Sequence, residues 1–212
     1  VKWTKGSTVG ESLITDLQID ELSGFFIDSN LNIYVAEHQS HKVTKWTPPY
    51  IVGNETIVAG GNGSGSGNNQ LNEPFGVFVD ESQNIYVSDG QNHRVMKWAP
   101  NASEGVLVAG GNGAGSALNQ LHYPMELYVH RSGDIYITDE SNGRIIKWGN
   151  GDSEGIVVAK NLAVPRGFHV TEDKVIYIAD RENDRVIKWK ENYLYKDIFC
   201  LLYTSDAADD LR

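Results

Sequence analysis

The chain has 212 residues, 40% of them hydrophobic, and a formal net charge of −10 at pH 7. This acidic balance argues against nucleic-acid binding, which depends on clustered Lys and Arg that attract phosphates. No apolar run reaches the roughly 18 residues that a membrane-spanning helix needs. The single cysteine, Cys200, offers no disulfide framework.

Each of the five tryptophans directly follows a lysine, and this Lys-Trp motif recurs along the chain. Successive tryptophans lie 43, 52, 50 and 41 positions apart, so one unit is repeated with loops of different length. A period of about 40–50 residues is typical of propellers, solenoids and arrays. The tryptophans are Trp3, Trp46, Trp98, Trp148 and Trp189.

Each unit is expected to contain four short strands. In chain order, residues 1–18 hold the end of a preceding unit, with a weak last strand at 13–14. The units that follow have first strands predicted at 24–28, 76–80, 127–129 and 167–170, and second strands at 33–35, 85–87, 135–137 and 176–178. The third strand of each unit ends in Lys-Trp, and fourth strands are predicted at 56–58, 106–108 and 156–158.

These runs are β-branched and aromatic and are bounded by Gly, Asn, Asp and Ser, which is typical of strands. No window of ten or more residues shows helical periodicity free of turn residues. Four strands per unit predict an all-β fold, a β-propeller built from four-stranded blades. A buried tryptophan removes roughly 150–250 Å² from water. We therefore expect Trp46, Trp98, Trp148 and Trp189 to be core residues rather than a platform for ligands.

The segment Leu-Asn-Glu-Pro-Phe-Gly-Val-Phe-Val-Asp at 71–80 is followed by Ile-Tyr-Val-Ser-Asp at 85–89 and Asn-His-Arg-Val at 92–95. This pattern resembles the NHL repeat, named for Asn-His-Leu. The later units keep most of it, and the first departs most, with Glu37 where the others have Asp. The resemblance covers residues 1 to about 189 and implies a β-propeller, commonly of six blades.

About four and a half blades are present, so the chain is expected to be a fragment of a six-bladed ring. Closure with four or five blades is the alternative. After residues 1–18, the blades are expected at 19–70, 71–120, 121–161 and 162–199. Residues 200–212 break the repeat and resemble a translated sequencing-library adapter, so they are set apart from the fold. Without them the net charge changes from −10 to −8, because three Asp and one Arg leave.

A tight turn after the second strand of each unit carries Asp, Asn and Arg. The carboxylates are expected to accept hydrogen bonds that hold the turn, or to pair with the arginines. His93 lies in this turn, but later copies have Gly143 and Asp184 there, which favours a structural role over a catalytic one. The repeated residues are Asp89, Asp139 and Asp180, with Arg94, Arg144 and Arg185.

The glycine-rich loops at 60–67 and 110–115 lack the lysine of a phosphate-binding P-loop, and we interpret them as connections between blades. The six histidines lack the spacing of a zinc site, and no calcium-binding loop is present. His38 and His41 share a turn to which the fold could bring His93 or His122. No metal and no cofactor is predicted.

The loops joining strand four to strand one, and strand two to strand three, lie on the same face of a propeller. The residues just before the first strands differ most between the copies, so a ligand preference is expected to be encoded there. The candidate ligand-binding residues are Phe75, Met125, Glu126, Arg166 and His93.

The preferred function is a non-catalytic binding or scaffold module for a protein, peptide or carbohydrate. The alternative is a metal-dependent hydrolase or lyase of the six-bladed propeller type, with its site in the central channel. The predicted first strands bring mainly apolar side chains to that channel, which favours the binding module. Three glycosylation sequons, at Asn54, Asn62 and Asn101, favour an extracellular setting.

Overall fold

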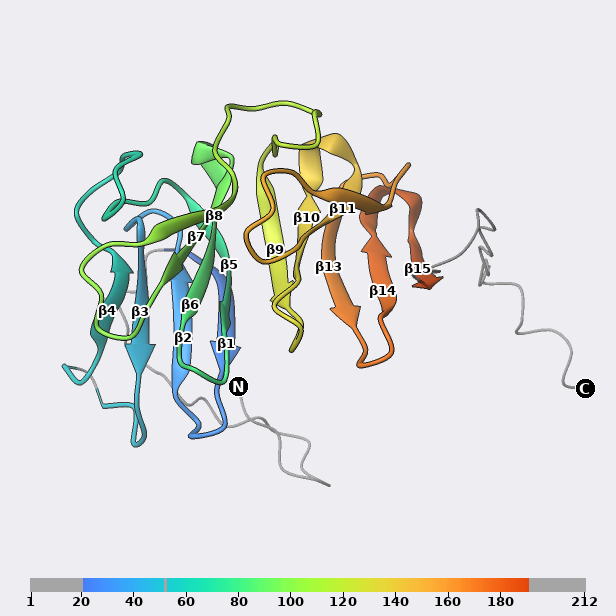
Figure 1. Ribbon diagram of the computed structural model, residues 1–212. Helices are drawn as coiled ribbons and strands as arrows, with labels where there is room; N and C mark the ends of the chain where they lie inside the picture. Colours follow the sequence, from blue (N-terminus) through green and yellow to red (C-terminus); the bar gives the residue numbers. More distant parts are fainter. Residues whose placement is uncertain (1–20, 52, 191–212) are drawn as a thin grey trace, which may run out of the picture.

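The computed structural model describes residues 21–51 and 53–190. Within these ranges the chain forms four antiparallel sheets that follow one another in chain order, from blue to red in Figure 1. The strands predicted at 13–14 and after Trp189, together with Trp3 and Cys200, lie outside the described residues.

Three of the sheets have four strands, and the last has three described strands. The first blade comprises β1 (Leu22–Ile27), β2 (Ile33–Glu37), β3 (Lys42–Trp46) and β4 (Thr56–Gly60). The second comprises β5 (Pro74–Val79), β6 (Ile85–Asp89), β7 (Arg94–Trp98) and β8 (Val106–Gly110). The third comprises β9 (Pro124–Val129), β10 (Ile135–Asp139), β11 (Arg144–Trp148) and β12 (Ile156–Ala159). The fourth comprises β13 (Pro165–Val170), β14 (Val175–Asp180) and β15 (Arg185–Lys190).

The all-β fold and its four-stranded propeller blades are confirmed. Within each blade, each strand pairs with the next one along the chain, as short hairpins predict. The described helical elements are three one-turn 3₁₀ helices, η1 (Gly90–Asn92), η2 (Glu140–Asn142) and η3 (Arg181–Asn183). Among the described residues, no helix is long and apolar enough to cross a bilayer.

The apolar core lies between blades rather than inside them. Tyr34 and Val43 of the first blade pack against Val87 and Trp98 of the second, and the same contact is repeated at the next two boundaries. Trp98 is only 1% exposed. In the second and third blades, both faces of the sheet are covered by neighbouring blades, so their strands are apolar on both faces and lack a simple alternation.

The first strand of each blade begins two or three residues earlier than predicted. The cause is a break in pairing register near its start: Pro74 pairs with Asp89, but the next paired residue is Val77, opposite Val87. Two residues therefore stand opposite one, which is the geometry of a β-bulge. Proline fits the first position because its missing N–H leaves no ladder bond unmade.

Candidate functional site

The bulges determine where the variable residues lie. Phe75 and Gly76 occupy the bulge of β5, Met125 and Glu126 that of β9, and residues 166–167 that of β13. β1 contacts β5, β5 contacts β9, and β9 contacts β13, so these bulges are neighbours at the inner edges of the blades. A bulge commonly redirects a side chain at a functional site.

The bulge residues line one hollow of about 630 Å³. Four of the five predicted ligand-binding residues meet there, namely Phe75, Met125, Glu126 and Arg166. We call this hollow the mouth pocket. Its lining also includes Glu21, Leu22, Ser23, His38, Gly76 and Gly167.

Glu126 stands where the other three blades have glycine: Gly24, Gly76 and Gly167. At Gly76, an added Cβ would lie 2.6 Å from the carbonyl oxygen of Met125 in the next blade. At Gly167, after which no further blade is described, none of the described residues lies within 4 Å of an added Cβ. Glycine is therefore required where neighbouring inner strands approach as closely as they do at Gly76.

The Glu126 carboxylate is partly buried, and burial raises its pKa above the usual value. Its Oε1 accepts a hydrogen bond from the N–H of Leu127 at 3.3 Å, which only partly offsets that effect. Within the described part of the chain, Glu126 forms no ion pair. The carboxylate thus keeps most of its hydrogen-bonding capacity for a group that enters the pocket.

Arg166 supplies the opposite charge at the rim. Its Nε lies 3.6 Å from Oε1 of Glu140 in η2, and its side chain is 53% exposed. Burial and then the hydrogen bond to Glu73 raise the pKa of nearby Tyr123 to about 12, so its hydroxyl remains a donor. The rim therefore carries a half-exposed cation that is paired with Glu140.

Phe75 is held in place by two rings from the neighbouring blades. It makes edge contacts with His38, at 4.8 Å between centroids, and with Tyr123, at 5.3 Å. Glu73 holds both of these rings in position. Its carboxylate accepts a hydrogen bond from the Tyr123 hydroxyl at 2.9 Å and lies 3.4 Å from Nε2 of His38. Sequence reasoning named His38 only in a possible group of histidines and did not name Tyr123, because nothing local to either residue indicates a contact with Phe75 of another blade.

The fifth candidate, His93, lies away from the mouth pocket. Its Nδ1 accepts a hydrogen bond from the N–H of Tyr123 at 3.2 Å, and its ring meets that of His122 at 5.5 Å. His41 makes the equivalent contact with the N–H of Glu73 at 3.1 Å. Both histidines thus join one blade to the next, and each has a left-handed backbone.

Burial, and then the proximity of His122, lower the pKa of His93 below its usual value. The unfolded chain therefore takes up a proton at a higher pH than the folded chain does, so the free energy of unfolding is expected to fall as the pH drops below about 6.5. We expect His93→Asn, which tolerates the left-handed backbone, to weaken this pH dependence. Urea unfolding at pH 7.5 and 5.5 measures it, with the exposed His169→Asn as control. Equal pH dependence in all three proteins would exclude His93 as the cause.

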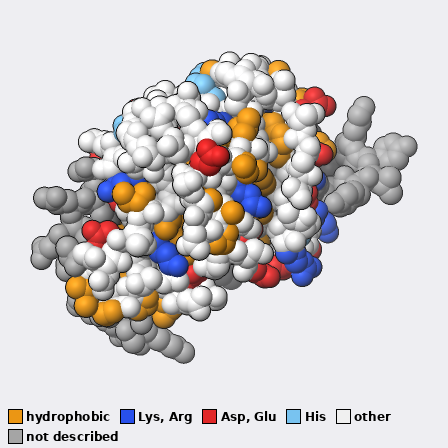
Figure 2. Space-filling model, turned by 60° about the vertical axis from the view of Figure 1, so that its left-hand side comes forward, with side chains coloured by type: hydrophobic (Ala, Val, Ile, Leu, Met, Phe, Trp, Pro, Cys, Tyr) orange, Lys and Arg blue, Asp and Glu red, His pale blue; other side chains and the backbone are white. Residues whose placement is uncertain are grey.

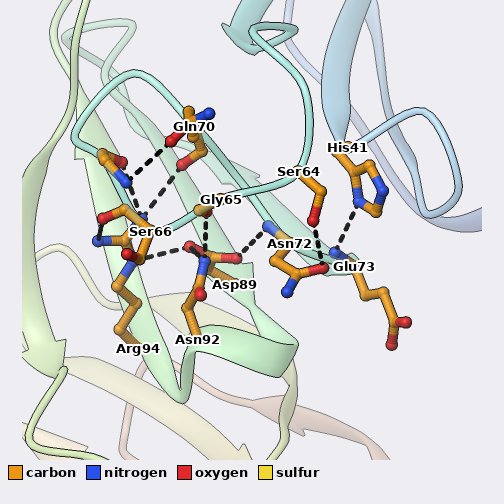
Figure 3. Close-up of polar contacts among 11 residues, drawn as sticks. His41, Ser64, Gly65, Ser66, Gln70, Asn72, Glu73, Asp89, Asn92 and Arg94 are labelled. Atoms are coloured by element: carbon orange, nitrogen blue, oxygen red, sulfur yellow. Dashed lines mark hydrogen bonds and ion pairs between the residues drawn. The ribbon is translucent and has the colours of Figure 1, made fainter.

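The repeated Asp and Arg form a network between loops (Figure 3). Oδ2 of Asp89 accepts from Nε of Arg94 at 2.7 Å, and its Oδ1 accepts from the N–H of Asn72 at 2.7 Å. The Arg94 guanidinium also donates to the carbonyls of Ser66, Gly67 and Gln70, at 2.8, 3.0 and 3.1 Å. One buried ion pair thus joins the turn after β6 to the glycine-rich loop before β5.

The third blade repeats this network, with Arg144 2.6 Å from Asp139, and the fourth has Arg185 2.7 Å from Asp180. Burial raises the pKa of Asp180, but hydrogen bonds from Asn183, the Ala163 N–H and Arg185 outweigh it and hold that pKa below the usual value. In the first blade Glu37 accepts from Thr44 at 2.6 Å and lies 3.2 Å from Lys42.

Elsewhere on the described surface, a ligand could be held by a cluster of metal ligands or by a charged or apolar patch. Among residues 21–51 and 53–190, no group of three or more His, Cys, Asp or Glu is arranged to hold a metal ion. Figure 2 shows hydrophobic, basic and acidic side chains interspersed on one face of the molecule. The glycine-rich loops connect β4 to β5 and β8 to β9, as predicted.

No protein-family model matches the chain, and no curated protein matches its sequence. Solved structures with a similar fold include nidogen from a nidogen–laminin complex, with a TM-score of 0.65 at 16% identity over 81% of this chain and 61% of that one. A putative gluconolactonase matches with a TM-score of 0.62 at 9% identity, over 82% of this chain and 61% of that one. A catalytically inactive virginiamycin B lyase from Staphylococcus aureus, solved with quinupristin, matches with a TM-score of 0.58 at 10% identity, over 82% of this chain and 54% of that one. The chain thus spans 54% to 61% of the length of these β-propellers.

Proposed function

We propose that the chain is an NHL-type β-propeller that acts as a non-catalytic binding module and takes a protein or peptide at the mouth pocket. The observation that carries the proposal is that the residues that differ most between the copies converge on one hollow. The residues that pack the blades together repeat from unit to unit. The side chains at the pocket positions differ between the units, as at Phe75, Met125, Glu126 and Arg166. A pocket with apolar walls and a few polar groups is typical of ligand sites.

The chemistry of the pocket supports a peptide ligand. Phe75 and Met125 provide apolar contact area, while Glu126 and Arg166 provide an acceptor and a donor for backbone or side-chain groups. The likeness to nidogen, solved in complex with laminin, supports a protein partner at the level of the fold. A carbohydrate remains the other ligand class for which hydrogen-bonding groups are present.

A library of random linear heptapeptides displayed on phage tests the proposal. Enriched peptides would be synthesised, and their dissociation constants measured by fluorescence anisotropy. We expect Arg166→Ala to weaken binding at least threefold. The matched control is Arg131→Ala, whose side chain is 73% exposed and lines a different hollow. If no peptide is enriched, or if both variants bind as tightly as the unmodified chain, the mouth pocket is not a peptide site.

The second candidate is a hydrolase or lyase, and the specific observation in its favour is Glu126. A partly buried carboxyl with a raised pKa is suited to general acid catalysis. Turnover of a panel of lactones and esters, measured with metal analysis of the same sample, tests this reading. Activity that Glu126→Gln abolishes would favour the enzyme, whereas activity that persists in this variant would exclude Glu126 as its acid.

A further inference from the structure

Glu126 introduces a carboxylate at a position that is occupied by glycine in the other three blades. Bringing a carboxylate into a partly apolar pocket costs free energy unless a cation or several donors face it. The donor in contact with it is one backbone N–H, at 3.3 Å. The cost is therefore only partly offset in the empty pocket.

The permanently charged side chain of the pocket lining pairs with a carboxylate other than Glu126, and its other N–H groups can donate to a peptide backbone. Arg166 points its guanidinium at Glu140, 3.6 Å away, and is half exposed. His38 lies beside two other carboxylates, with Nε2 3.4 Å from Glu73 and Nδ1 3.7 Å from Glu21. The described residues around the pocket thus present four carboxylates against one permanent cation.

The walls of the pocket suit the stem of a long basic side chain. Met125 is 8% exposed, and Phe75 is fixed between the rings of His38 and Tyr123. A methylene chain gains from contact with such apolar groups, and an aromatic face attracts a nearby cation. The net charge of −10 adds a longer-range attraction for basic partners.

We propose that the mouth pocket binds a Lys or Arg side chain of a peptide partner, with its cationic group at Glu126 and its stem against Phe75 and Met125. This inference rests on the proposed function, because it assigns a chemical class to the ligand of the same pocket. The partner's positive charge supplies the ion pair that Glu126 lacks within the described residues. An acidic or purely apolar peptide leaves the carboxylate buried without a counter-charge.

The two methionines of the chain provide the readout. Met125 lines the pocket, whereas Met96 is fully buried in the core between the first two blades. In protein labelled with ¹³C at the methionine methyl groups, the Met125 signal reports on the pocket and the Met96 signal reports on folding. The probes are the pentapeptides Gly-Gly-Lys-Gly-Gly, the same peptide with norleucine, and the same peptide with Glu, together with the peptides selected from the phage library.

We expect the lysine peptide to shift the Met125 signal and leave the Met96 signal in place. The norleucine and Glu peptides are expected to bind at least tenfold more weakly. Glu126→Gln is expected to remove this preference for lysine while keeping the Met96 signal, which shows that the variant is folded.

The possible outcomes distinguish a failure of this inference from a failure of the proposed function. If norleucine and lysine peptides bind alike, or if the preference survives in Glu126→Gln, the charge is not recognised by Glu126 and the inference is wrong. The inference is also wrong if the only peptides that shift the Met125 signal are library peptides without a basic residue. The proposed binding function is supported in that case. If no peptide shifts that signal, both proposals fall.

Discussion

Arg94→Met is expected to lower the free energy of unfolding by about 3–5 kcal/mol, because it leaves a buried carboxylate without its counter-charge. Asp89 is 0% exposed and loses the guanidinium that lies 2.7 Å away. The carbonyls of the glycine-rich loop lose their donors as well. Methionine keeps the apolar stem, so the variant isolates the charge and the hydrogen bonds. Urea unfolding followed by tryptophan fluorescence measures the loss.

The matched control is Arg131→Met. Its ion pair with Glu172 spans 3.0 Å, but the two side chains are 73% and 69% exposed. An exposed ion pair contributes less than about 1 kcal/mol. The free energy of unfolding of this variant is therefore expected to be close to that of the unmodified chain. A double variant that pairs Arg94→Met with Asp89→Asn is expected to regain part of the loss, since it also removes the buried charge. Equal effects of the two Arg variants would contradict the role given to burial.

Gly76→Ala is expected to lower the free energy of unfolding by about 1–3 kcal/mol through overpacking. The added methyl would lie 2.6 Å from the Met125 carbonyl oxygen and 3.1 Å from Cα of Glu126. Backbone atoms cannot rotate away as a side chain does, so β9 has to shift. The same shift is expected to disturb the mouth pocket and weaken peptide binding.

Gly167→Ala is the control at the equivalent position of the fourth blade. Among residues 21–51 and 53–190, nothing lies within 4 Å of an added Cβ there, and Gly167 is not in the left-handed region. Alanine at such a site stabilises by about 0.4–1 kcal/mol, because it restricts the unfolded chain. A loss at Gly167 as large as the loss at Gly76 would show that close packing between blades is not the reason for the glycine.

The repeat made the fold predictable. The Lys-Trp motifs and the β-branched runs indicated the blades and most of their strands, because each unit buries the same side chains in the same way. In the first blade, which departs most from the repeat, a different pair of contacts replaces the Asp–Arg ion pair. Glu37 lies beside Lys42 and accepts a hydrogen bond from Thr44. The starts of the first strands were misplaced because a bulge depends on pairing with the second strand, which local sequence does not reveal.

The candidate site was predictable only in part. Comparing equivalent positions identified Phe75, Met125, Glu126 and Arg166, which the structure brings together. The fifth candidate, His93, lies in the turn after the second strand and instead joins two blades through its Nδ1. The contacts around Phe75 could not be predicted, because they join residues from three blades whose distances depend on how the sheets pack.

The uneven spacing of the inner strands determines where new chemistry can arise in this molecule. At Gly76 even a methyl group collides with the next blade, whereas the boundary between β9 and β13 accommodates the whole side chain of Glu126. The glycine codons GGA and GGG become glutamate codons by one base change, so a recognition group can appear there in a single mutational step. At the tighter boundaries the same step would first have to overcome a loss of stability. Duplicated blades of this kind are therefore unequal starting points for divergence, and specificity is expected to evolve first at the loosest junction.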